Sequence, residues 1–430
     1  MSLLKSTRFI ADLHIHSRFS LATSRETSLE SIWKWAQIKG ITVVGTGDFT
    51  HPQWQKELKE QLHNIGNNLF KLKNKYQQDD LPSSCRGEVF FMLTSEVSCI
   101  FKKKGKVRKV HSLIFVPDFR AASRVAKALA KVGNLKSDGR PILGLDAKVL
   151  LKIVLDSSDK SMLVPAHAWT PHFSVFGEKS GFDMLEECFE ELTPNIYAIE
   201  TGLSSDPAMN WRLSALDGIT LISNSDAHSP AKLGREANIF DIARALKTGR
   251  HGPGDSEISY EFIMDAIKTR KGFAGTIEFF PEEGKYHYDG HRTCGVSLSP
   301  GETIRHNYVC PVCGKKVTVG VLHRVEELAD RREGFRPEGA VPFCSVIPLP
   351  EIIAETMKVG VNTKTVRKEY FRLIGKLGNE FRILLDTPLG DIERDGSPVL
   401  REAVGRMRSG NVHIVPGFDG EYGRVRIFEE

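Results

Sequence analysis

The chain has 430 residues, of which 40% are hydrophobic and 26% are charged, and its formal net charge is +5 at pH 7. These values are typical of a globular protein and exclude a disordered or fibrous chain. A chain of this length exceeds what one hydrophobic core normally supports, so two or three domains are expected. The sequence has no apolar run of about 18 residues, and its opening residues lack the apolar segment of a secretory signal. We therefore expect a cytoplasmic protein without a membrane partner.

Residues 1–282 alternate short apolar runs with helical stretches, a pattern that predicts repeated βα units and a parallel sheet or barrel. The strands expected from short runs of β-branched residues include 40–46, 161–166, 195–200 and 218–223. Asp48, His167 and Asp226 follow closely after such strands. Because α/β barrels build their active sites at the carboxyl ends of their strands, we expect a functional site there.

The segment at 10–20, IADLHIHSRFS, places Asp12, His14 and His16 at every second position after an apolar lead-in. Alternate residues of a strand share a face, so these side chains can converge. Two imidazoles at a strand end suit a bound metal. For this motif alone, a pair of hydrogen-bonded structural histidines is the alternative.

A hairpin is expected around the tip KKKGK at 102–106, with Glu96 on its first strand and His111 on its second. With the residues at strand ends, the candidate ligands are His14, His16, Asp48, Glu96, His111, His167, Asp226 and His228. Imidazoles and carboxylates suit zinc, manganese or iron, and a shared carboxylate can hold two ions about 3.5–4 Å apart. Glu200, at another strand end, is a candidate for orienting a ligand, with a buried structural carboxylate as the alternative.

The first 282 residues resemble the polymerase-and-histidinol-phosphatase (PHP) family of metal-dependent phosphoesterases. The motifs that carry the resemblance are DLHIHS, SEVSC, KVHSLIF, VPAHAW and SNSDAHS, in this order. The resemblance implies a distorted (β/α)7 barrel with two or three divalent ions, either Zn²⁺, Mg²⁺ or Mn²⁺. It implies one ion held by His14, His16, Glu96 and Asp226, and a second held by Glu96, His111 and His167. The catalytic residues expected from it are Asp226, His228 and Asp48.

The number of ions stays open between two and three. Ala22 and Phe49 stand where the family pattern has ligands for the third ion, and His228 is the clear match there. Asp48 or His51 could substitute for the missing ligands.

A second metal site is expected from the cysteines. Cys310 and Cys313 form a C-x2-C knuckle followed by glycine, a tight turn that presents two thiolates to one tetrahedral zinc. His291 and Cys294 form a second pair with the same spacing. The expected fourth ligand is His291, with Cys344 as the alternative, and such a closed site is structural.

We divide the rest of the chain into a small zinc-binding domain at 283–345 and a mainly helical C-terminal domain at 346–430. The C-terminal domain opens with an amphipathic helix. Its apolar face is Val366, Tyr370, Leu373 and Leu377, and its basic face is Lys364, Lys368, Arg372 and Lys376.

The layout of the whole chain resembles the endonuclease Q family of DNA repair nucleases. The motifs are GTGDFTHP, TIEFFPEEGKYHYDGHRTC, CPVCGKK and GVLHRVEELADR. The resemblance implies nicking of the phosphodiester on the 5′ side of deaminated bases (hypoxanthine, uracil, xanthine) and of abasic sites, leaving 3′-OH and 5′-phosphate ends. The alternatives are a PHP-family phosphatase of a small phosphomonoester metabolite and a nucleic-acid-binding module without catalysis. DNA with such lesions is the expected partner, and a sliding clamp is a further candidate.

Two kinds of DNA contact are expected. In the loop at 167–182, Trp169, Phe173 and Phe176 are candidates for the wall of a pocket that receives an extruded base, with packing beneath the loop as the alternative. The candidates for phosphate contacts are Lys102, Lys103, Lys104, Lys106, Arg108 and Lys109 at the hairpin tip, and Lys364, Lys368, Arg372 and Lys376 on the helix. A solvated charged surface is the alternative for both patches.

Overall fold

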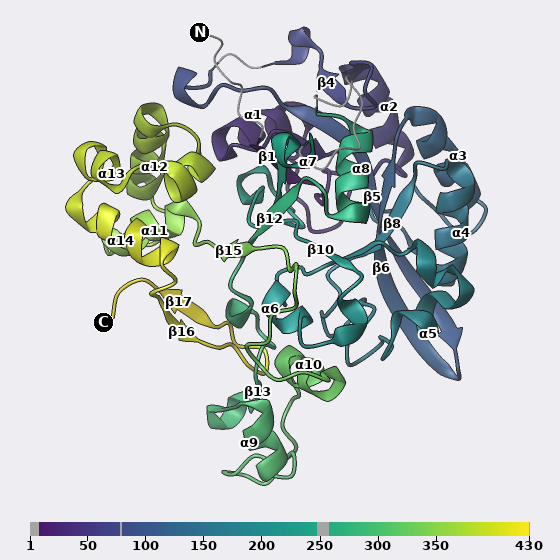
Figure 1. Cartoon of the computed structure of the whole chain (residues 1–430), viewed down its shortest axis with the longest axis vertical. Coiled ribbons are helices and arrows are strands. Elements are labelled where there is room, and N and C mark those ends of the chain that lie inside the picture. The colour runs from purple at the N-terminus through teal and green to yellow at the C-terminus, as the bar shows by residue number, and fades with distance from the viewer. Residues whose placement is uncertain (1–7, 78–79, 247–257, 430) are drawn as a thin grey trace.

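The computed structural model describes residues 8–77, 80–246 and 258–429, and it has a mixed α/β architecture around a central sheet (Figure 1). The strands of this sheet are β1 (Arg8–Asp12), β2 (Val43–Gly45), β3 (Leu62–Asn64), β4 (Phe70–Leu72), β5 (Phe90–Lys103), β6 (Lys106–Val116), β7 (Ile142–Leu143), β8 (Met162–Pro165), β11 (Ala237–Asp241), β12 (Phe273–Glu278) and β15 (Phe343–Ser345). Their spatial order is β15-β12-β11-β1-β2-β5-β4-β3, and β6 pairs with both β5 and β8. Strand β5 therefore connects the two halves of the sheet.

The sheet is mixed, although the sequence pattern favoured a parallel one. Strands β1, β2 and β5 are parallel, as expected for βα units. Strand β11 is antiparallel to both β1 and β12, and β6 is antiparallel to both β5 and β8. The reversals have local causes, because a tight hairpin joins β5 to β6 and the loop after residue 222 turns the chain back before β11.

A separate parallel pair, β9 (Ala198–Glu200) and β10 (Thr220–Ile222), lies between β8 and β11. On one side, the N–H of Ala168, just after β8, donates to the carbonyl of Glu200 (2.9 Å). On the other side, Asn238 Nδ2 of β11 donates to the carbonyl of Ser223 (2.7 Å). These bonds bring the ends of β1, β8, β9 and β10 into one region.

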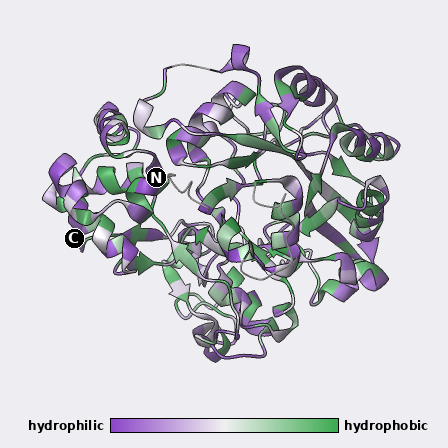
Figure 2. Cartoon of the chain, turned by 45° about the horizontal axis from the view of Figure 1, so that its top comes forward, coloured by the Kyte–Doolittle hydropathy of each residue, from purple (hydrophilic) through white to green (hydrophobic). Residues whose placement is uncertain are grey.

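Helices cover the sheet, and several begin where the sequence supplies a capping side chain. The helices before residue 282 are α1 (Leu29–Lys39), α2 (Pro52–Gln61), α3 (Phe119–Leu129), α4 (Ala147–Ser157), α5 (Leu185–Phe189), α6 (Pro207–Asn210), α7 (Ile242–Leu246) and α8 (Tyr260–Thr269). Helix α1 has a capping box of Ser28 and Ser31, and Asp118 and Asp146 cap α3 and α4. The outer helices carry both polar and apolar residues, as amphipathic helices do (Figure 2).

The expected hairpin is confirmed. Strands β5 and β6 pair in register from Leu93 opposite Val116 to Lys103 opposite Lys106. Lys104 and Gly105 at the tip both have positive φ (49° and 75°), which a two-residue turn of this kind requires.

The elements after residue 282 are small. Those up to residue 345 include β13 (Asp289–His291), β14 (Val296–Leu298), α9 (Pro300–Arg305) and α10 (Val321–Leu328). They are followed by α11 (Leu349–Thr356), α12 (Lys364–Leu377), α13 (Leu389–Asp395), α14 (Pro398–Arg408), β16 (His413–Val415) and β17 (Arg424–Arg426). The predicted apolar face of α12 is confirmed, because all four of its residues are buried.

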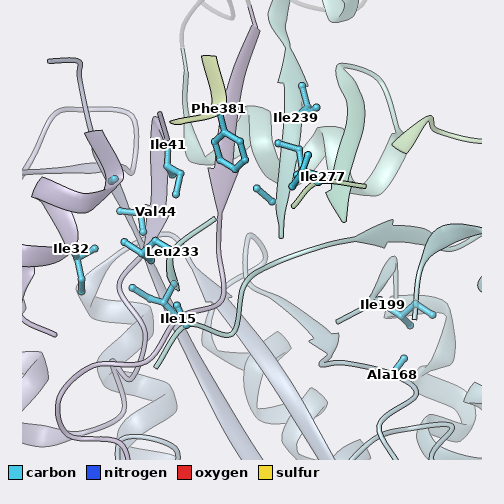
Figure 3. Packing of buried hydrophobic residues seen from close by; sticks show 14 of the residues in the cluster. Ile15, Ile32, Ile41, Val44, Ala168, Ile199, Leu233, Ile239, Ile277 and Phe381 are labelled. Carbon is cyan, nitrogen blue, oxygen red and sulfur yellow. The ribbon is translucent and has the colours of Figure 1, made fainter. Parts of the chain in front are cut away.

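Buried side chains of the C-terminal helical region pack on the sheet. Phe381 lies beside Ile41 and near Ile239 and Ile277, which belong to the first part of the chain (Figure 3). A β-carbon on Gly234 would lie 2.9 Å from the ring of Phe381, so this glycine permits the close approach. In the described ranges, we find no helix that combines the length and the apolar character needed to cross a membrane.

Candidate metal centre

The two histidines of the His-x-His motif lie in the protein interior after β1. The side chains of His14 and His16 have no exposed surface, and their Nε2 atoms are buried without a hydrogen-bond partner among the described residues. Asp12 is placed differently from what the alternating pattern suggests. It accepts hydrogen bonds from the N–H and hydroxyl of Ser225 (3.1 and 2.6 Å) and from the N–H of Gly234 (2.9 Å). Asp12 therefore fixes the loop after β10.

Glu96 of β5 divides its two oxygens between two groups of imidazoles. Its Oε2 lies 3.5 Å from His14 Nε2 and 3.2 Å from His16 Nε2. Its Oε1 lies 2.7 Å from His111 Nδ1 and 3.1 Å from His167 Nε2. Because Glu96 is 1% exposed, water does not compete for these oxygens. The carboxylate is therefore common to two clusters of ligand atoms.

Asp226 completes the first group from the loop after β10. Its Oδ1 lies 3.0 Å from His16 Nε2 and 3.5 Å from His14 Nε2. Burial favours the protonated carboxyl, yet His14 and His16 hold the pKa of Asp226 below its ordinary value. Its φ of +46° is uncommon for a residue with a side chain, and His167 (+30°) shares this feature. Such local strain is typical of functional sites.

These side chains fit divalent cations. The ligand atoms within each cluster lie within 4.8 Å of one another, and the clusters are His14, His16, Glu96, Asp226 and Glu96, His111, His167. Buried polar atoms without a partner are costly, and His14 Nε2, His16 Nε2 and Asp226 Oδ1 are such atoms. Cations shared through Glu96 would satisfy all three atoms, and the mixture of imidazole and carboxylate suits zinc or manganese.

Two further carboxylates set the tautomers of the ligand rings. Nδ1 of His14 donates to Glu200 (3.0 Å to each oxygen), and Nδ1 of His16 donates to Asp48 (3.1 Å). Each ring then presents the lone pair of Nε2 toward the cluster. Glu200 also accepts from the N–H of His167 (2.8 Å), so it couples ligands of both clusters. The sequence had left the role of Glu200 open, and the structure gives it these contacts.

The side chains considered for a third ion are engaged elsewhere. Asp48 has no exposed surface, and its Oδ2 accepts from the N–H of Ser17 (2.6 Å) while its Oδ1 holds His16. Nε2 of His51 lies 3.3 Å from the carbonyl of Lys136. Within the described part of the chain, neither residue belongs to a cluster of potential ligands.

His228 lies at the rim of the site. Its Nδ1 lies 2.8 Å from the carbonyl of Asp226, and its ring centroid is 4.5 Å from that of His16. A carbonyl only accepts, so Nδ1 carries the proton and Nε2 is unprotonated in the neutral ring. Burial and the neighbouring His16 hold the pKa of His228 below its ordinary value. With 31% of its side chain exposed, His228 is more accessible to solvent than the four histidines of the clusters.

Arg140 is a residue that the sequence did not single out. Its Nη1 lies 3.2 Å from Glu96 Oε2, so a permanent cation borders the clusters. It comes from the irregular segment before β7, where no motif surrounds it, and its proximity depends on the fold alone.

A separate cluster gathers the expected zinc ligands. The ligand atoms of His291, Cys294, Cys310 and Cys313 lie within 4.8 Å of one another. The knuckle is closed by hydrogen bonds from the N–H of Gly314 to the carbonyl of Cys310 (2.9 Å) and from the N–H of Cys310 to that of Lys315 (2.7 Å). The alternative ligand Cys344 lies on β15 with its Sγ 3.8 Å from the carbonyl of Thr276. Burial raises the pKa of Cys344 to about 11, so it is a protonated thiol outside the cluster.

The aromatic residues of the loop at 167–182 differ in exposure. Trp169 is 1% exposed, donates from Nε1 to Asn210 (2.8 Å) and packs on Phe176, which is 2% exposed. Phe173 is partly exposed, and its ring centroid lies 4.8 Å from that of His111. Trp169 and Phe176 therefore pack in the interior beneath the loop, as the alternative interpretation expected, whereas Phe173 lies next to the metal-ligand clusters.

The candidate phosphate contacts divide into paired and unpaired cations. Lys103 bonds Glu190 (2.8 Å), Lys104 bonds Glu187 (2.7 Å) and Arg372 bonds Glu369 through two nitrogens. Of the residues that the structure describes, none forms an ion pair with the exposed cations Lys102, Lys106, Lys364 and Lys368. Lys109 stacks over Phe173 (5.1 Å to the ring centroid) and Arg108 over Phe182 (4.2 Å).

Known proteins match this chain over single regions and over nearly its full length. A family model described as the MJ0043 C-terminal domain matches residues 348–411. The protein MJ0043 of Methanocaldococcus jannaschii is 33% identical over 281 residues, which are 64% of this chain. The match spans only 33% of the length of that relative.

Two solved structures match almost the full length. The lesion-specific endonuclease PfuEndoQ from Pyrococcus furiosus is 31% identical, with a TM-score of 0.83 over 98% of this chain and 96% of that chain. A structure of Endonuclease Q in complex with a 27-mer duplex substrate, with an abasic lesion at the active site, is 30% identical. Its TM-score is 0.80 over 98% of this chain and 97% of that chain.

Replacement of Glu200 tests its hold on the ligand rings. We expect Glu200→Gln to lower the affinity for divalent ions about 10- to 100-fold, because a neutral amide polarises His14 less than a carboxylate does. Equilibrium dialysis with Mn²⁺ followed by elemental analysis measures this affinity. The exposed variant Glu186→Gln is the control, and unchanged binding in Glu200→Gln would contradict the role.

The cysteine cluster gives a second expectation. Cys310→Ser should remove one equivalent of zinc from the purified protein, whereas Cys344→Ser should retain it, because Cys344 lies outside the cluster. Elemental analysis of both variants provides the measurement. Loss of zinc in Cys344→Ser with retention in Cys310→Ser would reverse the assignment.

Proposed function

The chain belongs to the endonuclease Q family, and from this premise we propose that it is a metal-dependent DNA repair endonuclease. It nicks the phosphodiester bond on the 5′ side of a lesion and leaves 3′-OH and 5′-phosphate ends. The observation that carries the proposal is the division of Glu96 between two clusters of potential ligands, the arrangement used by two-metal phosphoesterases. Divalent ions held there would polarise the phosphodiester and activate the attacking water.

Each cluster of potential ligands would hold one divalent ion. His14, His16, Glu96 and Asp226 would hold one ion, and Glu96, His111 and His167 would hold the other. Mg²⁺, Mn²⁺ and Zn²⁺ are the proposed ions. Asp48 acts through His16, whose tautomer it sets, so a third ion is not part of the proposal.

His228 is the proposed general base. Its Nδ1–H is held by the carbonyl of Asp226, which leaves Nε2 to accept a proton from the attacking water. A pKa below the ordinary value keeps the ring neutral near pH 7, as a base requires. The water oxygen forms a bond to phosphorus, the bond from phosphorus to the 3′ oxygen breaks, and the released 3′ oxygen takes up a proton from solvent.

The proposed substrates are DNA duplexes with hypoxanthine, uracil, xanthine or an abasic site. Support comes from the relative whose structure holds a duplex with an abasic lesion at the active site. A deaminated base must leave the stack to reach a pocket, which costs a few kcal/mol and costs less in a mismatch. Phe173 is the proposed contact to this base, because it is partly exposed and its ring lies beside His111. A sliding clamp stays a candidate partner.

We further infer the division of the chain into a barrel at 1–282, a zinc-binding domain at 283–345 and a helical domain at 346–430. The position of the β9–β10 pair between β8 and β11 supports closure of the strands into a distorted (β/α)7 barrel. The four-ligand cluster supports a structural zinc in the second region, and helices α11 to α14 support the third.

Nicking of an end-labelled duplex with a single deoxyinosine tests the function. We expect lesion-dependent nicking with Mg²⁺ or Mn²⁺ and none after chelation. Asp226→Asn should lower the rate at least 10³-fold, because it removes a charged ligand from the first cluster. The exposed variant Asp159→Asn is the control.

Two outcomes would contradict the proposal. One is the absence of a lesion-dependent nick with any of the three ions. The other is efficient hydrolysis of simple phosphomonoesters with indifference to DNA, which would indicate a small-molecule phosphatase.

The salt dependence of DNA binding tests the unpaired cations. Each phosphate neutralised contributes about −0.9 to the slope of log K against log salt, so Lys364→Ala with Lys368→Ala should reduce the slope by about 1 to 2. Arg372→Ala with Lys376→Ala is the matched control, because these cations pair with Glu369 and Asp395 and should change the slope less. Fluorescence anisotropy at several salt concentrations measures both. If both double variants change the slope equally, ion pairing within the protein does not determine which cations contact DNA phosphates.

A further inference from the structure

Arg140 is held by its backbone at the edge of the two clusters. The N–H of Arg140 donates to Asp138 (3.1 Å), and the N–H of Gly139 donates to the carbonyl of Phe19 (2.9 Å). On the other side, the carbonyl of Pro141 accepts from the N–H of Ser98 on β5 (3.0 Å). The segment is therefore tied both to the loop after the His-x-His motif and to the strand that carries Glu96.

Gly139 allows the backbone before Arg140 to approach the side chains of Asp48 and Ser20 closely. A β-carbon at this position would lie 2.4 Å from Asp48 Oδ2 and 2.4 Å from Ser20 Oγ. Because Asp48 in turn holds His16, the segment before Arg140 rests directly on a group that orients a ligand of the first cluster. The position of Arg140 relative to the clusters is therefore fixed by the fold.

The guanidinium of Arg140 contacts the clusters through Nη1, and within the described residues its other nitrogens have no hydrogen-bond partner. Its Nη1 lies 3.2 Å from Glu96 Oε2. Among the ion pairs of the described residues, this is the one that joins an arginine or lysine to either cluster. An arginine has five N–H donors, and the side chain of Arg140 is 25% exposed, so solvent reaches part of this side chain beside Glu96.

The chemistry of this position matches a phosphodiester. Arginine stays protonated, and its planar fork bonds two oxygens of a phosphate group. In phosphoryl transfer, negative charge is spread over the oxygens that are neither attacked nor expelled, and fixed donors stabilise it. A donor that is already held by Glu96 and by its backbone needs little reorganisation when the substrate arrives.

On the basis of the proposed nuclease function, we propose that Arg140 is a further catalytic residue. It binds a non-bridging oxygen of the scissile phosphodiester and stabilises the negative charge that develops there. The guanidinium keeps its protons throughout. Water gives a proton to His228 as its oxygen bonds to phosphorus, and the 3′ oxygen leaves phosphorus and takes up a proton from solvent. The alternative is that Arg140 only balances the negative charge of Glu96 and does not contact the substrate.

The test compares Arg140→Ala and Arg140→Lys with Lys136→Ala, an exposed residue of the same loop whose loss changes the charge equally. Three quantities are measured: single-turnover nicking, bound metal by elemental analysis, and the affinity of the metal-loaded protein for inorganic phosphate by calorimetry. We expect Arg140→Ala to nick 10²- to 10³-fold more slowly with unchanged metal content. Its phosphate affinity should fall at least tenfold, and added guanidinium should restore part of the rate.

Arg140→Lys should lose less, because it keeps the charge without the planar fork. The proposal is overturned if both variants retain the wild-type rate and phosphate affinity, or if they lose metal and guanidinium does not restore the rate, which would assign Arg140 to holding Glu96. Failure of the wild-type protein to nick lesion-containing DNA would instead refute the proposed function. The phosphate affinities would still decide whether Arg140 binds an oxyanion.

Discussion

The structure depends on one carboxylate that serves two groups of imidazoles. Glu96 reaches both because β5 pairs with β2 on one side and with β6 on the other, at the junction of the two halves of the sheet. The first group comes from the ends of β1 and β10, and the second from β6 and the end of β8. A buried carboxylate surrounded by imidazoles is costly without a positive charge nearby, and bound cations together with Arg140 would supply that charge.

A second layer of side chains holds these groups in place. Asp48 and Glu200 fix the tautomers of His16 and His14, and Asp12 fixes the loop that carries Asp226. These carboxylates are fully buried, so their geometry is determined by packing rather than by solvent. Local backbone strain at Asp226 is tolerated because this layer surrounds it. The result is a preorganised site, beside which His228 and Arg140 are partly exposed to solvent.

The sequence predicted the parts of the protein that depend on local spacing. The His-x-His pair, the hairpin, the apolar face of α12 and the gathering of His291 with three cysteines all follow from short patterns. The reversal of β11, the contacts of Asp12 and the burial of Trp169 depend on tertiary packing, which spacing does not encode. Ion pairing of Lys103 and Arg372 depends in the same way on where acidic partners lie. Arg140 carried no signal, because its role arises from a loop folded onto a distant strand.

Electron paramagnetic resonance of the Mn²⁺-loaded protein shows whether Glu96 joins two cations. With two equivalents of Mn²⁺, we expect the spectrum of an exchange-coupled pair, because ions about 3.5–4 Å apart and bridged by a carboxylate interact magnetically. A spectrum of isolated Mn²⁺ ions at every loading would show that the cations lie too far apart to share Glu96.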